Sequence, residues 1–395
     1  MNKAFIHRFY AVLIVLAGLS IKVPYANAQH GAAPSVPPST ANQLSATHAS
    51  ATHPAAGEAS KTAEQVFKNI QALKGTPADQ LQTAMQFISN SLGVECAFCH
   101  VQDAFEKDDK KPKQTARQMI QMQLAINRDN FKGEREVTCY SCHHGSEHPA
   151  GIPIIADEEP KRQIPQDAAA MPSADQIIDK YVQAVGGADA LQKITSRVQK
   201  ATIIFGDRQF PAEVLSKSPN KRISTMHTPN GDNITAFDGH AGWLGNPGGR
   251  PPRDMTAQES EAISFDATFY LPTEIKKMFA ELRVRPAEKI ARHEVYQVIG
   301  SNPGKPPVRL YFDQVSGLLL RTIRYAESPL GRNPTQVDYA EYRIDSGVKL
   351  PFQWTVARPL GRFTIQVAEI QQNVPIDDSK FTKPAAAPEQ KPAAK

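Results

Sequence analysis

The distribution of apolar positions divides this chain into a helical part followed by a part built of strands. Between residues 62 and 131, apolar side chains recur every three or four positions, as they do on one face of an α-helix. We predict three helices in this part, over residues 62–73, 76–92 and 115–131. Pro77 suits the first turn of the second helix, and Gly93 suits a left-handed end to it.

After residue 172 the periodicity changes. Residues 173–194 are typical of a short helical lead-in, and short runs of alternating apolar and polar residues follow, separated by turn-forming residues. We predict ten strands, over residues 198–205, 212–216, 222–228, 233–237, 293–299, 308–312, 318–324, 336–342, 352–357 and 363–373. The predicted fold class is therefore α+β in two domains, an N-terminal all-α domain and a C-terminal curved antiparallel β half-barrel with a flanking helix.

Composition places the borders of these parts. The first 28 residues hold Lys3, Arg8, an apolar run and Ala26-Asn27-Ala28, which is the pattern of a cleaved secretory signal; a retained N-terminal anchor is the alternative. We expect a signal at 1–28, a disordered segment at 29–60, a helical domain at 61–148, a Pro-rich linker at 149–172, a β-rich domain at 173–383 and a disordered tail at 384–395. This predicts an exported, periplasmic protein, either soluble or peripheral to a membrane.

The charge balance excludes one class of partner. The chain has 45 basic and 40 acidic residues, which gives a formal net charge of +5. The predicted signal contains Lys3, Arg8 and Lys22 and no acid, so 42 basic and 40 acidic residues remain and the charge falls to +2. So small an excess gives no footprint for nucleic acid.

All four cysteines fall in two copies of Cys-x-x-Cys-His, at residues 96–100 and 139–143. Two thiols at this spacing attach to one haem, and the adjacent histidine is held against its iron. We therefore predict two covalently attached haem c groups, with Cys96, Cys99, Cys139 and Cys142 as attachment points and His100 and His143 as iron ligands. A zinc site and a redox dithiol also use Cys-x-x-Cys pairs, but neither requires a histidine after both pairs.

Methionines on the predicted helices are candidates for the sixth position of each iron. Met85 precedes Cys96 by eleven residues, whereas Met119 and Met122 precede Cys139 by twenty and seventeen. Ligation by methionine and histidine raises the reduction potential, as suits an electron carrier. A methionine in an apolar stripe is also an ordinary core residue. Histidines are further candidates, namely His144, His148, His30, His48 and His53, and the residues alone leave the choice open.

Residues 85–100, 116–127 and 137–145 resemble the cytochrome c subunit of photosynthetic reaction centres. In that family a methionine on the helix before each motif is the sixth ligand. The resemblance therefore implies Met85 for the first haem and Met119, rather than Met122, for the second. It covers about residues 62–148 and implies electron transport rather than an enzymatic activity. The usual subunit has four haems. Two motifs therefore indicate a half-length relative of that subunit, and the resemblance is not evidence for photosynthesis.

The second part has a resemblance of its own. Residues 237–243, 311–321 and 342–352 are similar to the periplasmic lipoprotein-carrier type of half-barrel, which implies an apolar cup able to hold acyl chains. Trp243 and Trp354 are expected in the core. His227, His240 and His293 are isolated in the sequence and indicate no catalytic or metal site.

Three functions remain open from the sequence. The first is a periplasmic dihaem electron carrier that serves redox partner proteins, such as a membrane-bound reaction-centre-like or respiratory complex. The second is a haem enzyme, for example a peroxidase with one open iron. The third is a module whose β domain binds a lipid or a partner. The run Lys110-Lys111-Pro112-Lys113 is expected to be a solvated loop that can attract an acidic redox partner.

Overall fold

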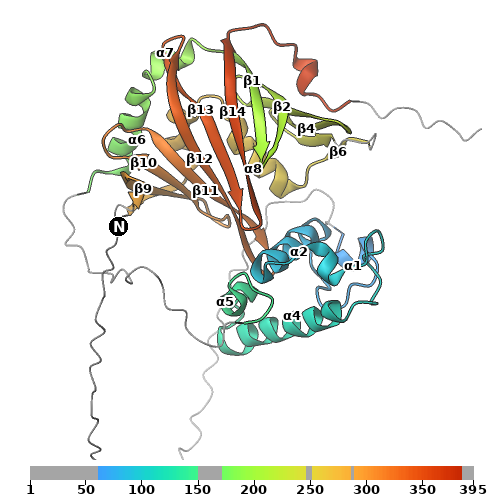
Figure 1. Cartoon of the computed structure of the whole chain (residues 1–395). Coiled ribbons are helices and arrows are strands. Elements are labelled where there is room, and N and C mark those ends of the chain that lie inside the picture. The colour runs from blue at the N-terminus through green and yellow to red at the C-terminus, as the bar shows by residue number, and fades with distance from the viewer. Residues whose placement is uncertain (1–60, 150–170, 246–250, 286–288, 385–395) are drawn as a thin grey trace, which may run out of the picture. The chain divides into compact units, whose positions relative to one another are not determined.

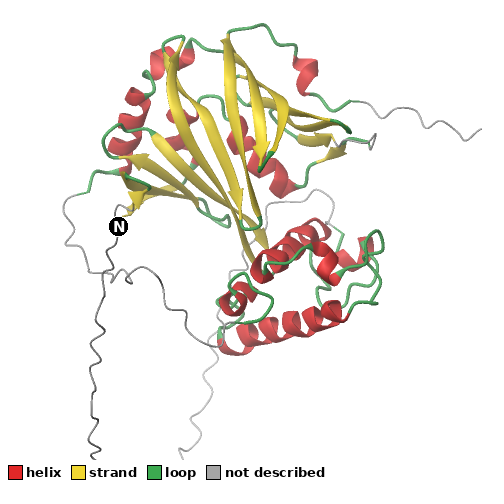
Figure 2. Ribbon diagram, in the orientation of Figure 1, coloured by secondary structure: helices red, strands yellow, loops and turns green. Residues whose placement is uncertain are grey.

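The computed structural model describes residues 61–149, 171–245, 251–285 and 289–384, which all fall within one compact unit. The predicted signal at residues 1–28 and the predicted disordered segment at 29–60 lie outside the described residues. So do most of the linker and the tail. Helices make up the first described part, residues 61–149, and the sheet forms in the part that follows (Figure 2). We call these the helical part and the β-rich part.

The helical part contains one amphipathic helix whose end is fixed by glycine. The helices of this part are α1 (Ala63–Val66), α2 (Ala78–Leu92), α3 (Cys96–Cys99), α4 (Lys111–Asn130) and α5 (Cys139–His143). Leu81, Phe87 and Ile88 form the buried face of α2. The helix ends at Gly93, whose φ of 68° is left-handed. A Cβ at Gly93 would lie 2.2 Å from the carbonyl oxygen of Gly145. Both this close approach and the left-handed φ therefore exclude a side chain at this position.

Two helix predictions need correction. The helix predicted over residues 62–73 stops at Val66, because Asn69 adopts a left-handed φ of 59°. Its side-chain amide donates hydrogen bonds to the carbonyl of Glu106 at 2.5 Å and to Asp108 Oδ1 at 3.0 Å. A side chain that bonds a distant loop in this way competes with a continuing helix. The helix predicted to begin at residue 115 begins at Lys111.

The β-rich part is a single curved antiparallel sheet (Figure 1). Its strands are β1 (Ser196–Phe205), β2 (Arg208–Lys217), β3 (Lys221–Thr228), β4 (Gly231–Phe237), β5 (Gly242–Gly245), β6 (Arg253–Asp254), β7 (Glu281–Arg285), β8 (Lys289–Ile290), β9 (His293–Ser301), β10 (Val308–Asp313), β11 (Leu319–Ser328), β12 (Gly331–Asp345), β13 (Val348–Arg358) and β14 (Gly361–Gln372). The strand order is β6-β5-β4-β3-β2-β1-β14-β13-β12-β11-β10-β9-β7, with β8 paired to β9. All ten predicted strands are confirmed, and β5 to β8 are additions.

Helices and a C-terminal turn bury the two faces of this sheet. The helices are α6 (Ala174–Ala184), α7 (Ala188–Gln192), α8 (Ala257–Ala267) and α9 (Leu271–Met278). Ile178 and Tyr181 of α6 pack with Ile275 of α9 and Phe312 of β10 in the largest apolar cluster. Elsewhere Trp243 is 4% exposed, as predicted, and its indole N–H donates to the carbonyl of Phe381 at 2.8 Å. The sequence predicted the flanking helix α6 but neither α8 nor α9.

The turn between β11 and β12 belongs to the core of the helical part. Leu330 is fully buried and joins the apolar cluster of α2, which includes Phe87. A Cβ at Gly331 would lie 2.1 Å from the Phe87 ring, so the turn and α2 are in close contact. Asn333 donates from its amide to the carbonyl of Thr83 at 2.9 Å. A residue of the β-rich part, far along the chain from both motifs, therefore completes the apolar cluster of the helical part.

Among the residues described, none of the helices has the length and apolar character that a membrane crossing requires.

Replacing Leu330 by alanine is expected to destabilise the helical part. The change removes fully buried methyl groups and leaves a cavity among α2 side chains, so the free energy of unfolding should fall by about 2–5 kcal/mol. Urea unfolding followed by circular dichroism measures this loss. The matched control is Leu360→Ala, because Leu360 is 45% exposed and its loss should change stability by less than about 0.5 kcal/mol. Equal effects of the two changes would contradict the packing described.

Candidate functional site

Each Cys-x-x-Cys-His motif forms one short turn of helix. Helix α3 holds the first cysteine pair and α5 the second, and the residue before each helix is extended. The entry to α5 is fixed by Thr138, whose backbone N–H donates to Ser141 Oγ at 3.0 Å. Side chains three positions apart on a helical turn lie on the same side of it. The two thiols of each pair therefore lie on the same side of their helical turn.

Both motif histidines make the same hydrogen bond to the backbone. His100 Nδ1 lies 3.0 Å from the carbonyl oxygen of Phe105, and His143 Nδ1 lies 3.0 Å from the carbonyl oxygen of Ser146. A carbonyl oxygen only accepts hydrogen bonds, so each Nδ1 carries the proton and each Nε2 keeps its lone pair. This is the tautomer that a metal-ligating histidine requires, with its ring orientation fixed by the second nitrogen.

The geometry argues against the two other uses of cysteine pairs. Within the described ranges, no three His, Cys, Asp or Glu side chains gather in a way that could hold a metal ion. Burial raises the pKa of Cys139 to about 11 and also raises the pKa of Cys99. A reactive dithiol needs the opposite shift, because the thiolate is the nucleophile.

Exposed apolar surface gathers in the helical part. Eight of the twelve exposed large apolar side chains of the described residues lie there, namely Val66, Phe67, Phe105, Met119, Met122, Leu124, Phe131 and Tyr140. The Phe105 ring lies 5.3 Å from the His100 ring, centroid to centroid, and Tyr140 belongs to the second motif. Exposed apolar side chains mark a binding surface where they form one contiguous patch.

The candidate sixth ligands lie in different surroundings. Met85 is half-buried against the apolar cluster of α2, and Cys139 packs against the same cluster. Met119 and Met122 are 39% and 47% exposed on α4. The structure thus brings Met85 close to the second motif, and the pairing of each methionine with an iron stays a prediction.

The alternative histidine ligands are less well placed by the structure. His144 and His148 are exposed, and His144 adopts a left-handed φ of 50° with its ring against Tyr140. His30, His48 and His53 lie outside the described residues.

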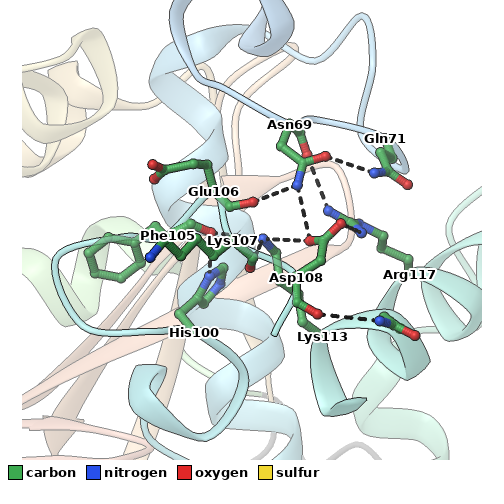
Figure 3. A network of polar contacts seen from close by, with 10 residues as sticks. Asn69, Gln71, His100, Phe105, Glu106, Lys107, Asp108, Lys113 and Arg117 are labelled. Carbon is green, nitrogen blue, oxygen red and sulfur yellow. Dashed lines mark hydrogen bonds and ion pairs between the residues drawn. The ribbon is translucent and has the colours of Figure 1, made fainter. Parts of the chain in front are cut away.

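A polar network that sequence reasoning missed holds the loop after the first motif (Figure 3). Lys113 is only 8% exposed, and its ammonium group donates to the carbonyls of Phe105 at 2.8 Å and Lys107 at 2.7 Å. It also pairs with Asp108 at 3.0 Å. Hydrogen bonds from Arg117 and then from Lys113 hold the pKa of Asp108 well below its usual value. This loop is therefore fixed by side chains of α4.

The loop before the second motif is held from the same helix. Asn127 donates from its side-chain amide to the carbonyl of Val137 at 2.7 Å and accepts from the N–H of Val137 at 2.9 Å. Gln123 donates to the same carbonyl at 3.1 Å. Lys113, Ile120 and Asn127 recur every seven residues and share the buried face of α4. This spacing is the feature of the sequence that could have identified the buried polar residues.

The basic run at residues 110–113 is not the solvated loop that we expected. It starts helix α4, and Lys110 donates to the carbonyl of Ala97 while Lys113 is buried. Between residues 102 and 111 the exposed charged side chains are of both signs, namely Asp103, Glu106, Lys107, Asp109 and Lys111. These loop residues form no basic patch that would select an acidic partner.

The β-rich part offers no comparable arrangement among its described residues. His227 and His293 are not isolated as predicted, since each pairs with one carboxylate, Asp232 at 2.8 Å and Asp313 at 2.9 Å. A hollow of about 240 Å³ lies beside α6 and is lined partly by Tyr296. This hollow is smaller than the pockets that usually hold small-molecule ligands. It does not by itself provide the apolar cup that the sequence suggested.

Comparison with protein families gives one match over nearly half of the chain. Residues 29–221 match the family described as photosynthetic reaction centre cytochrome C subunit. The chain is 30% identical over 112 residues to the photosynthetic reaction center cytochrome c subunit of Thermochromatium tepidum, which covers 27% of this chain and 28% of that protein. It is 33% identical over 85 residues to cytochrome c-554 of Chloroflexus aurantiacus, which covers 20% of each. The matched part is less than a third of the length of either relative.

Solved structures resemble the chain over about half of its length. A DUF1329 family protein from Desulfovibrio piger covers 54% of this chain and 98% of its own, with 12% identity and a TM-score of 0.40. A LolA superfamily protein from Nitrosomonas europaea covers 54% and 99%, with 15% identity and a TM-score of 0.36. The family match spans both Cys-x-x-Cys-His motifs, which lie within residues 29–221. Over these residues the chain is similar to the family of the photosynthetic reaction centre cytochrome c subunit.

Proposed function

We propose that this protein is an exported, periplasmic c-type cytochrome that transfers single electrons through two covalently attached haem c groups. The observation that carries the proposal is that both Cys-x-x-Cys-His motifs hold their histidine by the same hydrogen bond to the backbone. In both motifs the histidine donates a hydrogen bond from Nδ1 to a backbone carbonyl, which leaves Nε2 available for a metal. The similarity to the cytochrome c subunit family over residues 29–221 supports a role in electron transfer.

The residues have separate roles in this proposal. The thiols of Cys96 and Cys99 attach the first haem, and those of Cys139 and Cys142 attach the second. His100 and His143 hold the proximal side of each iron through Nε2. A bound haem c supplies reversible one-electron chemistry at iron.

Methionine ligation on the distal side would make both haems electron carriers rather than ligand-binding sites. Following the family pattern, we assign Met85 and Met119 to this role. Ligation on both faces leaves no open position for peroxide or another small molecule, which disfavours the haem-enzyme alternative. Electrons are then exchanged with redox partner proteins, such as a membrane-bound respiratory or reaction-centre-like complex.

Purified protein is expected to carry two haem groups by intact mass. The double change Cys139→Ala and Cys142→Ala should remove one of them, because both thioether links of the second motif are lost. The matched control is Tyr140→Phe, since Tyr140 also lies between the two cysteines, has no thiol and keeps its ring in this change. This control should retain both haems. Colourless exported protein with four alkylatable thiols would refute the proposal.

The change Met119→Ala is expected to remove the iron-to-methionine charge-transfer band of one haem and to lower its potential, because a strong-field thioether is lost. The control is Met122→Ala, since Met122 lies one turn away on the same helix with similar exposure. Visible spectra and redox titration measure both effects.

An unaltered spectrum in Met119→Ala would exclude this residue as a ligand. A reversed result, with loss only in Met122→Ala, would transfer the role to Met122. Met85→Ala tested in the same way, in variants that carry one motif each, determines which iron each methionine serves. Readily formed carbon monoxide complexes at both haems of the reduced wild-type protein would contradict ligation by methionine.

A further inference from the structure

Lys113 is a buried cation whose hydrogen-bonding capacity is completely used. An ammonium group has three donors, and Lys113 directs them to the carbonyl of Phe105, the carbonyl of Lys107 and the carboxylate of Asp108, all within 3.0 Å. Lysine is seldom buried unless it is paired in this way. The ammonium group is therefore held at one place in the fold.

One of these acceptors also binds the histidine of the first motif. The carbonyl oxygen of Phe105 accepts from His100 Nδ1 at 3.0 Å and from Lys113 Nζ at 2.8 Å. Figure 3 shows His100 and Lys113 converging on this segment of the loop. A carbonyl has two lone pairs, so it can accept both bonds at once. The bond from a charged donor is the stronger of the two, and it withdraws electron density from the carbonyl.

The second motif lacks this arrangement. His143 Nδ1 donates to the carbonyl of Ser146, and in the described part of the chain no side chain donates to that oxygen as well. The two histidines thus make the same hydrogen bond to a carbonyl. Among the described residues, only the acceptor of His100 also receives a hydrogen bond from a charged side chain.

The ion-pair network around Lys113 has two positive charges and one negative charge. Asp108 carries one negative charge and lies between two cations, Lys113 at 3.0 Å and Arg117 at 2.9 Å. Asn69 donates to the same carboxylate at 3.0 Å. A net positive charge held close to an iron favours its reduced state, because that state has one positive charge fewer.

We propose that Lys113 is a positioning residue that raises the reduction potential of the haem at the first motif above that of the haem at the second. Its ammonium group weakens the acceptor of His100, which makes this histidine a poorer electron donor to iron. It also supplies positive charge at a fixed place. The two haems then differ in potential, and electrons collect at the first.

The inference rests on the proposed attachment of two haems, and its test separates the two claims. The test is a redox titration of the full-length holoprotein, with the haem count checked first by intact mass. Lys113→Gln should lower the reduction equilibrium constant of one haem by between about threefold and tenfold, which is about 28–59 mV at 59 mV per tenfold. The second haem should be unchanged. Single-motif variants identify which haem responds.

Two further variants separate electrostatics from loosened structure. Lys111→Gln is the matched control, because Lys111 lies two residues away on the same helix and is exposed. It should change neither potential. Asp108→Asn removes the negative charge and should raise the same potential that Lys113→Gln lowers. Lys113→Arg retains the charge and should restore most of the wild-type value.

The outcomes decide the inference directly. Shifts of opposite sign in Lys113→Gln and Asp108→Asn, confined to the first haem, support it. No shift in either variant, or shifts of the same sign in both, overturns it while the haem count still supports the proposed function. If Lys113→Gln fails to accumulate as holoprotein, Asp108→Asn decides alone, since a rise supports the inference and a fall or no change overturns it. Protein without haem overturns both claims.

Discussion

Polar side chains on the buried face of α4 hold the loops of both motifs, and the candidate site depends on them. Lys113 binds carbonyls of the loop that follows the first motif, whereas Asn127 binds the backbone of Val137 just before the second. Loops without regular structure need such partners, because their buried backbone groups are otherwise unsatisfied. One helix thus positions two loops that are about 30 residues apart along the chain.

The same backbone groups connect fold and chemistry. Each histidine uses a carbonyl further along the chain as its acceptor, five residues on for His100 and three for His143, so ring orientation follows from the shape of the loop. The end of α2 takes part as well, because the N–H of Gly145 donates to the carbonyl of Ser91 at 2.9 Å. Gly93 permits this close approach since it has no side chain. The second motif is therefore fixed by α2 on one side and by α4 on the other.

Much of this structure could be predicted from sequence, and the failures have physical causes. The motifs and α2 were found because their signals are local, namely fixed cysteine spacing and a regular apolar stripe ending in glycine. The first helix was overestimated because Asn69 bonds a loop 37 and 39 residues away, at Glu106 and Asp108, which no local pattern reveals.

The role of Lys113 was missed for a related reason. A lysine next to other lysines is usually solvated, and only its position seven residues before Ile120 indicated the buried face. In the β-rich part, alternation found the ten longer strands, but β6 and β8 have two residues each and carry no periodic signal. The pairing of methionines with irons could not be derived either, because it depends on which helix faces which motif.

The position of Leu330 has an evolutionary consequence. Along the chain, Leu330 lies between strands β11 and β12, but its side chain packs in the apolar cluster of the helical part. Gene fission that released the two motifs as a separate small cytochrome would leave an apolar hole beside Phe87, which a new side chain would have to fill. Substitutions at the hairpin tip and on α2 should consequently be correlated across descendants of this gene.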